Sequence, residues 1–109
     1  MRRGDILTVA LQGDFGKRRP AIVIESDRLP PTDSTLVCLI TSTLLDDATF
    51  RRQPIEASPS TGLRAPSQIM VDKIFAVRRS NCGPSIGVLD KAAMRTLDRK
   101  MALVIGLAD

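Results

Sequence analysis

The chain has 109 residues, of which 43% are hydrophobic and 26% charged, and this predicts one small globular domain over residues 1–109. No apolar run approaches the roughly 18–20 residues that a membrane span needs, and residues 1–5 precede no signal-peptide core. A cytoplasmic protein without membrane contact is therefore expected. His, Trp and Tyr are absent, which excludes Ser–His–Asp catalysis, histidine-ligated metal and a Tyr or Trp platform for stacking bases.

Basic side chains outnumber acidic ones, sixteen to twelve, for a formal net charge of +4. Twelve of the sixteen are arginine, whose planar guanidinium suits bidentate phosphate contacts. This balance favours a polyanionic partner such as a nucleic acid. Cys38 and Cys82 form no CxxC motif, so reduced thiols are expected, and neither a metal nor a cofactor is predicted.

Apolar runs and turn residues divide the chain into short strands. Gln12 to Arg18, with Gly13 and Gly16, forms a predicted loop, and a second loop covers 27–34. A Cys82-Gly83-Pro84 break is expected to precede the last strand. The predicted strands are 6–11, 20–24, 35–41, a short edge strand at 53–57, 67–77 and 86–89.

One helix is predicted at the end of the chain, over residues 91–105. Asp90 is a good N-cap and Gly106 a stop signal. Its apolar stripe, which we expect to pack on the sheet, consists of Met94, Leu97, Met101 and Val104. Closely spaced strands plus one terminal helix predict a mainly β fold, a small curled antiparallel sheet or barrel with a C-terminal α-helix.

Several short motifs follow one another along the chain: Gly4-Asp5-Ile6, Arg19-Pro20-Ala21-Ile22-Val23-Ile24, Leu39-Ile40-Thr41-Ser42, Gly62-Leu63, Ser67-Gln68-Ile69-Met70-Val71-Asp72 and Ile86-Gly87-Val88-Leu89. In this order they resemble the MazF/PemK toxins, and together they cover essentially the whole chain. Each motif is common alone, but their order and spacing are specific.

The resemblance implies a type II toxin of a toxin–antitoxin pair with an SH3-like β-barrel of the CcdB/MazF type. Such toxins are homodimeric endoribonucleases that cut single-stranded RNA at short sequences without a metal. They leave a 2′,3′-cyclic phosphate and a 5′-hydroxyl, and a cognate antitoxin blocks the RNA groove. The sequence itself identifies neither the RNA sequence nor the antitoxin.

By the same resemblance, Arg19 and Thr41 match the catalytic positions. A guanidinium can neutralise charge on a phosphorane, and a hydroxyl can donate to it. Asp72 matches an acidic position that relatives use in catalysis or in base recognition; a structural salt bridge is the open alternative. The proton acceptor for the 2′-hydroxyl is likewise left open, because a neutral arginine is costly.

Six further residues are candidate RNA contacts: Lys17, Arg18, Ser42, Arg51, Arg52 and Gln68. The loops at 13–18 and 46–53 are expected to decide the recognised sequence. The chain departs from the PemK-like branch, because it lacks a first-loop histidine and has Met70 where that branch has an arginine. The MazF-like Arg/Thr arrangement is the better template.

Two other interpretations remain open. A gyrase poison resembling CcdB depends on a C-terminal tryptophan, which this chain lacks. A non-catalytic SH3-like or Sm-like nucleic-acid-binding module is disfavoured by the presence of both Arg19 and Thr41.

Overall fold

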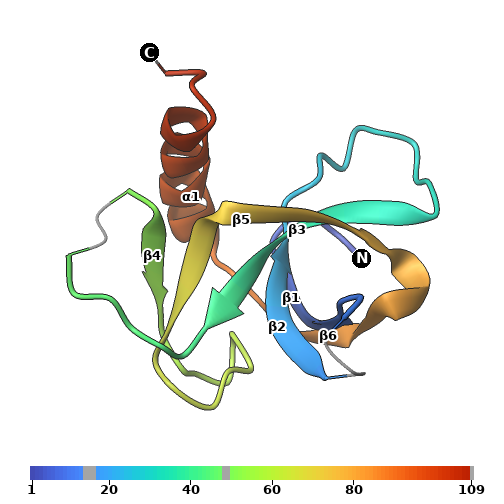
Figure 1. Cartoon of the computed structure of the whole chain (residues 1–109), viewed down its shortest axis with the longest axis horizontal. Helices are drawn as coiled ribbons and strands as arrows, with labels where there is room; N and C mark the ends of the chain where they lie inside the picture. Colours follow the sequence, from blue (N-terminus) through green and yellow to red (C-terminus); the bar gives the residue numbers. More distant parts are fainter. Residues whose placement is uncertain (14–16, 48–49, 109) are drawn as a thin grey trace.

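The structure is a computed structural model that describes residues 1–13, 17–47 and 50–108. Figure 1 shows a curled sheet with the C-terminal helix beside it at one end of the molecule. The elements are β1 (Asp5–Ala10), β2 (Arg18–Val23), β3 (Ser34–Thr41), β4 (Arg52–Ile55), β5 (Ser67–Arg78), the 3-10 turn η1 (Arg79–Asn81), β6 (Cys82–Val88) and α1 (Lys91–Val104). Two parts of the predicted loops lie outside the described residues. They are residues 14–16 of the loop at 12–18 and residues 48–49 of the loop at 46–53.

All strands belong to one antiparallel sheet with the order β4-β5-β3-β2-β1-β6. The predicted strands are confirmed with small shifts at their ends, but the predicted break at Cys82-Gly83-Pro84 is wrong. Those residues begin β6, which pairs with β1 through two register irregularities. An edge strand tolerates Gly83 and Pro84 because one of its sides needs no ladder donor, and the other edge strand, β4, likewise contains Pro54.

Alternating side chains give the sheet two apolar faces. One face packs against α1, where the predicted stripe is confirmed: Leu97 is fully buried, and Met94, Met101 and Val104 pack around it. The other face holds a second cluster, formed by Leu7, Val9, Ala21, Val23, Val37, Leu39 and Val77.

A turn, rather than a strand pair, joins the two edges of the sheet. The turn after β4 packs backbone to backbone on β6, and Val88 N–H donates to the Ser60 carbonyl at 2.9 Å. Gly62 and Gly87 allow this approach, because a Cβ on either would lie 2.0–2.3 Å from backbone atoms of Ile86 or Thr61. The mainly β fold with a C-terminal helix is confirmed, and its barrel is a curled open sheet completed by this turn.

Asp90 and Gly4 start elements near the two ends of the chain, and the predicted N-cap is confirmed. Asp90 caps α1, because its carboxylate accepts from the Ala93 N–H at 2.8 Å. Gly4 makes the turn before β1 with φ +95°, where a residue with a side chain would be strained. The described part of the chain holds no helix with the length and apolarity that a membrane crossing requires.

Candidate active site

The register of β2 and β3 brings the two predicted catalytic residues together. The β2–β3 ladder pairs Ala21 with Leu39, and Arg19 and Thr41 each lie two residues beyond that pair. Because alternate residues of a strand share a face, the two side chains continue the same face of the sheet. Both residues border the same cavity.

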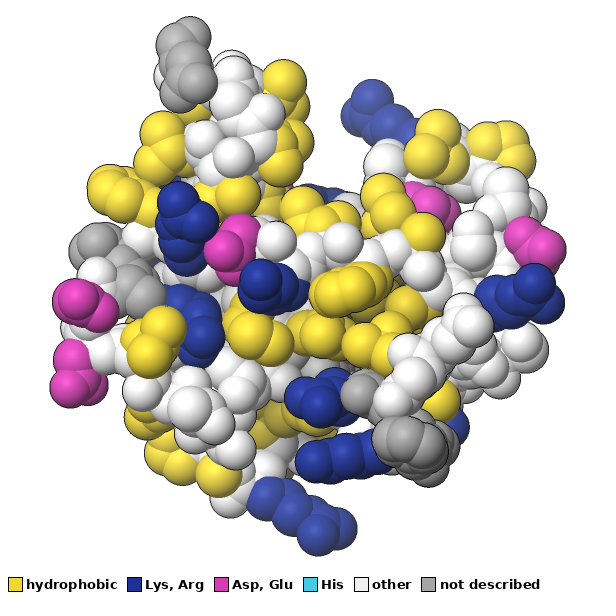
Figure 2. Space-filling model, viewed as in Figure 1, with side chains coloured by type: hydrophobic (Ala, Val, Ile, Leu, Met, Phe, Trp, Pro, Cys, Tyr) yellow, Lys and Arg dark blue, Asp and Glu magenta, His cyan; other side chains and the backbone are white. Residues whose placement is uncertain are grey.

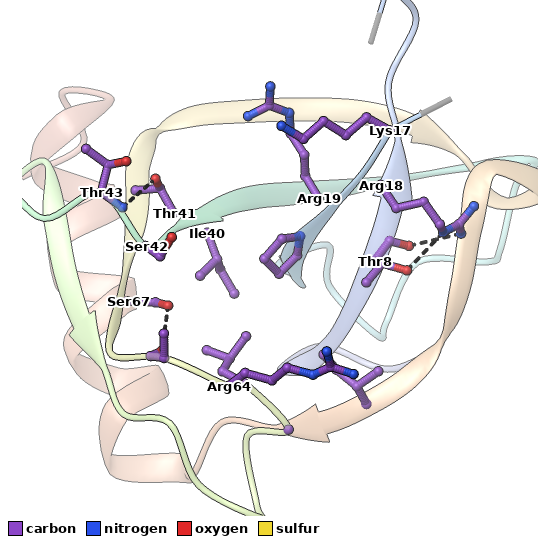
Figure 3. A pocket seen from close by; sticks show the side chains of 15 residues that line it. Thr8, Lys17, Arg18, Arg19, Ile40, Thr41, Ser42, Thr43, Arg64 and Ser67 are labelled. Atoms are coloured by element: carbon purple, nitrogen blue, oxygen red, sulfur yellow. Dashed lines mark hydrogen bonds between the residues drawn. The ribbon is translucent and has the colours of Figure 1, made fainter. Parts of the chain in front are cut away.

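Arg19 and Thr41 line one open cavity with a volume of about 620 Å³. Figure 3 shows it bordered by Arg19 from β2, by Thr41 and Ser42 at the end of β3, and by Arg64 across the opening. Among the described residues that line it, four are basic and none is acidic. The basic residues are Lys17, Arg18, Arg19 and Arg64. Such a cavity attracts an anion, which agrees with the polyanionic partner predicted from the sequence.

Figure 2 shows the same charge at the molecular surface. Several Lys and Arg side chains gather on the lower part of the visible face, where Figure 1 places the start of β2. Apolar side chains occupy the middle of that face. A backbone of phosphates crossing the cavity would thus meet basic groups on both sides of it.

Thr41 lies in a local turn that orients its hydroxyl. Its Oγ1 accepts a hydrogen bond from the Thr43 N–H at 3.1 Å (Figure 3). Since one oxygen lone pair is used by this bond, the hydroxyl hydrogen can donate to a ligand in the cavity. The Thr41 hydroxyl can therefore supply the donor that a phosphate or phosphorane oxygen needs.

Arg18 is fixed at the mouth of the cavity by β1 and η1. Its Nε donates to Thr8 Oγ1 at 3.0 Å, and its Nη2 donates to the Thr8 and Asn81 carbonyls, each at 3.4 Å. Gly83 leaves room for this arrangement, because a Cβ there would lie 2.8 Å from Thr8 Oγ1. Arg18 therefore presents its charge from a defined position beside Arg19.

Arg64 is a site residue that the sequence analysis missed. It follows the Gly62-Leu63 motif and lines the cavity across from Arg19 (Figure 3). The motif itself was visible in the sequence, but the loop reaches the cavity only because its turn packs on β6. Thr8, Thr43 and Ser67 also line the cavity, and none of them was predicted as a site residue, although Ser67 begins one of the family-like motifs.

Four predicted site residues lie outside the cavity lining: Asp72, Arg51, Arg52 and Gln68. Asp72, on β5, forms an ion pair with Arg51, with Nη1 and Oδ2 3.5 Å apart. Gln68 and Arg52 bind the loop after β3: Gln68 Oε1 accepts from the Leu45 N–H at 3.1 Å and from Arg52 Nη1 at 3.0 Å. RNA contact by these four residues, and catalysis by Asp72, stay predictions.

The two cysteines are free thiols, as expected for the reduced pair. Burial, with Asp72 nearby, raises the pKa of Cys38 to about 12, so this thiol stays protonated at neutral pH. Among the described residues, no group of three or more Cys, Asp or Glu side chains is arranged to hold a metal ion.

Residues 2–105 match the family described as the PemK-like, MazF-like toxin of type II toxin–antitoxin systems. The chain belongs to this family. It is also 40% identical, over 99% of both chains, to a probable endoribonuclease MazF of Mycolicibacterium smegmatis. The predicted MazF/PemK membership and the prediction of a toxin endoribonuclease are thereby confirmed.

Solved structures of MazF proteins have the same fold. The Mycobacterium tuberculosis toxin MazF-mt6 has a TM-score of 0.80 at 21% identity, covering 94% of this chain and 96% of that one. A mycobacterial endoribonuclease in complex with its cognate antitoxin has a TM-score of 0.79 at 18% identity, covering 98% and 96%. A MazF from Deinococcus radiodurans has a TM-score of 0.70 at 16% identity, covering 97% and 96%. The curled sheet with its terminal helix is thus the MazF toxin fold.

Proposed function

We propose that this MazF-type toxin, acting as a single domain over residues 1–109, cuts single-stranded RNA at short sequences without a metal. The products are a 2′,3′-cyclic phosphate and a 5′-hydroxyl. One observation carries the proposal: Arg19 and Thr41 face one cavity whose charged walls are entirely basic among the described lining residues. A guanidinium and a hydroxyl that line the same cavity suit a phosphorus centre that gains negative charge.

In the proposed reaction the 2′-oxygen attacks the neighbouring phosphorus and the bond from phosphorus to the 5′-oxygen breaks. Arg19 grips two non-bridging oxygens and stabilises the added charge of the five-coordinate state. Thr41 donates its hydroxyl hydrogen to one of those oxygens and holds the phosphate in line. The 2′-hydroxyl loses one proton and the departing 5′-oxygen gains one, so no net proton is consumed.

Asp72 is a candidate proton acceptor for the 2′-hydroxyl, a role that the sequence left open. Its half-buried carboxylate pairs with the exposed Arg51, which supports the salt-bridge alternative equally well. Asp72→Asn separates the two roles. Loss of cleavage with unchanged RNA binding supports the acceptor, whereas a fall in the midpoint of urea unfolding with normal cleavage supports the salt bridge.

Lys17, Arg18 and Arg64 are proposed to hold the RNA backbone on both sides of the reacting phosphate. Because the protein lacks Trp and Tyr, base reading relies on backbone groups, on Ser42 and on arginine planes. The acting form is proposed to be a cytoplasmic homodimer. A cognate antitoxin would inhibit it by covering this basic cavity, a role supported by the mycobacterial relative solved in complex with its own antitoxin.

The test is cleavage of a long RNA in the presence of a chelator, with analysis of the ends. Cyclic-phosphate and 5′-hydroxyl ends are expected from the wild-type protein. Arg19→Ala should abolish cleavage and growth arrest while leaving the fold intact, and Thr41→Val should lose most activity. Arg95→Ala, which removes an exposed charge on α1 away from the cavity, is the matched control and should cleave normally.

The outcomes separate the competing interpretations. Binding of RNA without cleavage would favour a nucleic-acid-binding module, and gyrase inhibition without RNA cleavage would favour a CcdB-like poison. Full activity of Arg19→Ala would move the chemistry to another part of the surface.

A further inference from the structure

We propose that Gln68 and Arg52 together act as a positioning device for Thr41, and we call their two side chains the loop clamp. The inference rests on the proposed function, because it assigns how the hydroxyl donor is held for RNA cleavage. It also gives these two residues a role other than the RNA contact predicted from the sequence.

The loop clamp closes on the segment that follows β3. Gln68 forms a two-point contact with the backbone of Leu45: Oε1 accepts from the N–H at 3.1 Å, and Nε2 donates to the carbonyl at 3.0 Å. This paired geometry reproduces the contact that a neighbouring strand would make. The exposed loop is thereby fixed to β5 although Leu45 itself is about half exposed.

Arg52 connects this contact to the catalytic turn. Its Nη1 donates both to Gln68 Oε1, at 3.0 Å, and to the carbonyl of Thr43, at 3.1 Å. The N–H of that same Thr43 donates to Thr41 Oγ1. A continuous chain of hydrogen bonds therefore runs from β5 through the clamp to the hydroxyl that faces the cavity.

The clamp residues are themselves well anchored. Gln68 is the cross-strand partner of Thr41 in the β3–β5 ladder, and Arg52 belongs to β4, which pairs with β5. Lys100 of α1 donates to the Arg52 carbonyl at 3.0 Å. Neither clamp residue lines the cavity, so each acts on the reaction through the turn at residues 41–45.

A misplacement of about 1 Å in a reacting group can cost about 100-fold in rate, so loss of the clamp should affect catalysis more than binding. Gln68→Met keeps the length and bulk of the side chain and removes its hydrogen bonds. We expect kcat to fall by about 10- to 100-fold while KM for RNA changes little. Arg52→Met should likewise lower kcat with little change in KM. Gln68→Glu keeps the acceptor oxygen and should retain most of the wild-type kcat.

Two measurements distinguish a positioning role from a merely structural one. In a Thr41→Val background, Gln68→Met should lower kcat no further, because the donor that it positions is already absent. In amide hydrogen exchange, Gln68→Met should speed exchange at both Leu45 and Thr43, while core amides of β3 such as Val37 keep their protection.

The contrary results are equally definite. Three results for Gln68→Met would overturn the clamp: an unchanged kcat, a raised KM at constant kcat, or an equal fall in kcat in the wild-type and Thr41→Val backgrounds. The raised KM would mean that Gln68 contacts the RNA directly. Faster exchange at Leu45 alone would overturn the clamp too, because the effect would then stop short of the turn. A wild-type protein that cuts no RNA would overturn the proposed function instead, and the exchange at Thr43 would still decide whether the clamp holds the turn.

Discussion

Gly87→Ala tests the backbone contact that completes the curled sheet. A Cβ at this position would lie 2.3 Å from both the carbonyl carbon and the oxygen of Thr61, and 2.5 Å from the Ser60 oxygen. These are backbone atoms, so no side-chain rotation relieves the overlap. The turn must instead move away from β6, and its movement would break the hydrogen bond from Val88 N–H to the Ser60 carbonyl.

The expected cost follows from these two terms. Overpacking in a close contact costs about 1–3 kcal/mol, and a lost backbone hydrogen bond adds about 1 kcal/mol. Gly87→Ala should therefore lower the free energy of unfolding by about 2–4 kcal/mol. With a urea m-value of about 1.5 kcal/mol/M, the unfolding midpoint would fall by about 1.5–2.5 M.

Gly13→Ala is a matched control, because Gly13 has a left-handed backbone conformation but open space around an added Cβ. Its φ is +89°, yet a Cβ there would have no neighbour within 4 Å. Left-handed strain alone should cost about 1 kcal/mol. If urea unfolding followed by circular dichroism shows Gly87→Ala to be no less stable than Gly13→Ala, the turn does not pack on β6 as described.

Three other predictions concern charge, burial and reactivity. Arg64→Ala should weaken RNA binding and make the slope of log binding constant against log salt concentration shallower by about 0.7. Arg95→Ala should leave that slope unchanged, and a slope for Arg64→Ala equal to that of the wild type would show that Arg64 does not contact the RNA. The Gln53 Oε1 atom is buried with no hydrogen-bond partner among the described residues, while its Nε2 donates to the Ala93 carbonyl at 3.0 Å. Gln53→Leu removes both, so the free energy of unfolding should change by less than about 1 kcal/mol, and a loss of about 2 kcal/mol or more would contradict this. At pH 8 a thiol reagent should label Cys82 and spare Cys38, and labelling of both thiols in the folded protein would refute the burial of Cys38. The raised pKa of Cys38 also predicts that the free energy of unfolding falls as pH rises from about 9 to 12, because only the unfolded chain ionises in that range.

The strands and helix were predictable because their signals are local. Continuous apolar runs marked β2 and β3, and Asp90 with the stripe around Leu97 marked α1. The break predicted at Gly83-Pro84 failed because those residues are strand breakers only in the middle of a sheet. Their place at an edge depends on the pairing of β6 with β1, which no local pattern records.

The proposed catalytic pair was predictable only through the family resemblance, and the structure adds that Arg19 and Thr41 line one cavity. Arg64 was not predictable, because its approach depends on a backbone contact between Gly62 and Ile86, far apart in sequence. The side chain of Gln68 carried a polar signal, but its hydrogen bonds to Leu45 depend on how the loop after β3 folds back. Polar residue types thus marked the region of the site without indicating which of them face it.

The prolines of the two outer strands have a consequence for self-association. Pro54 in β4 and Pro84 in β6 lack the amide hydrogen that an incoming strand would need, so neither border offers an unbroken row of donors. A second molecule therefore cannot extend the sheet in register from either side. This arrangement protects the folded chain against fibril-like stacking even at high local concentration.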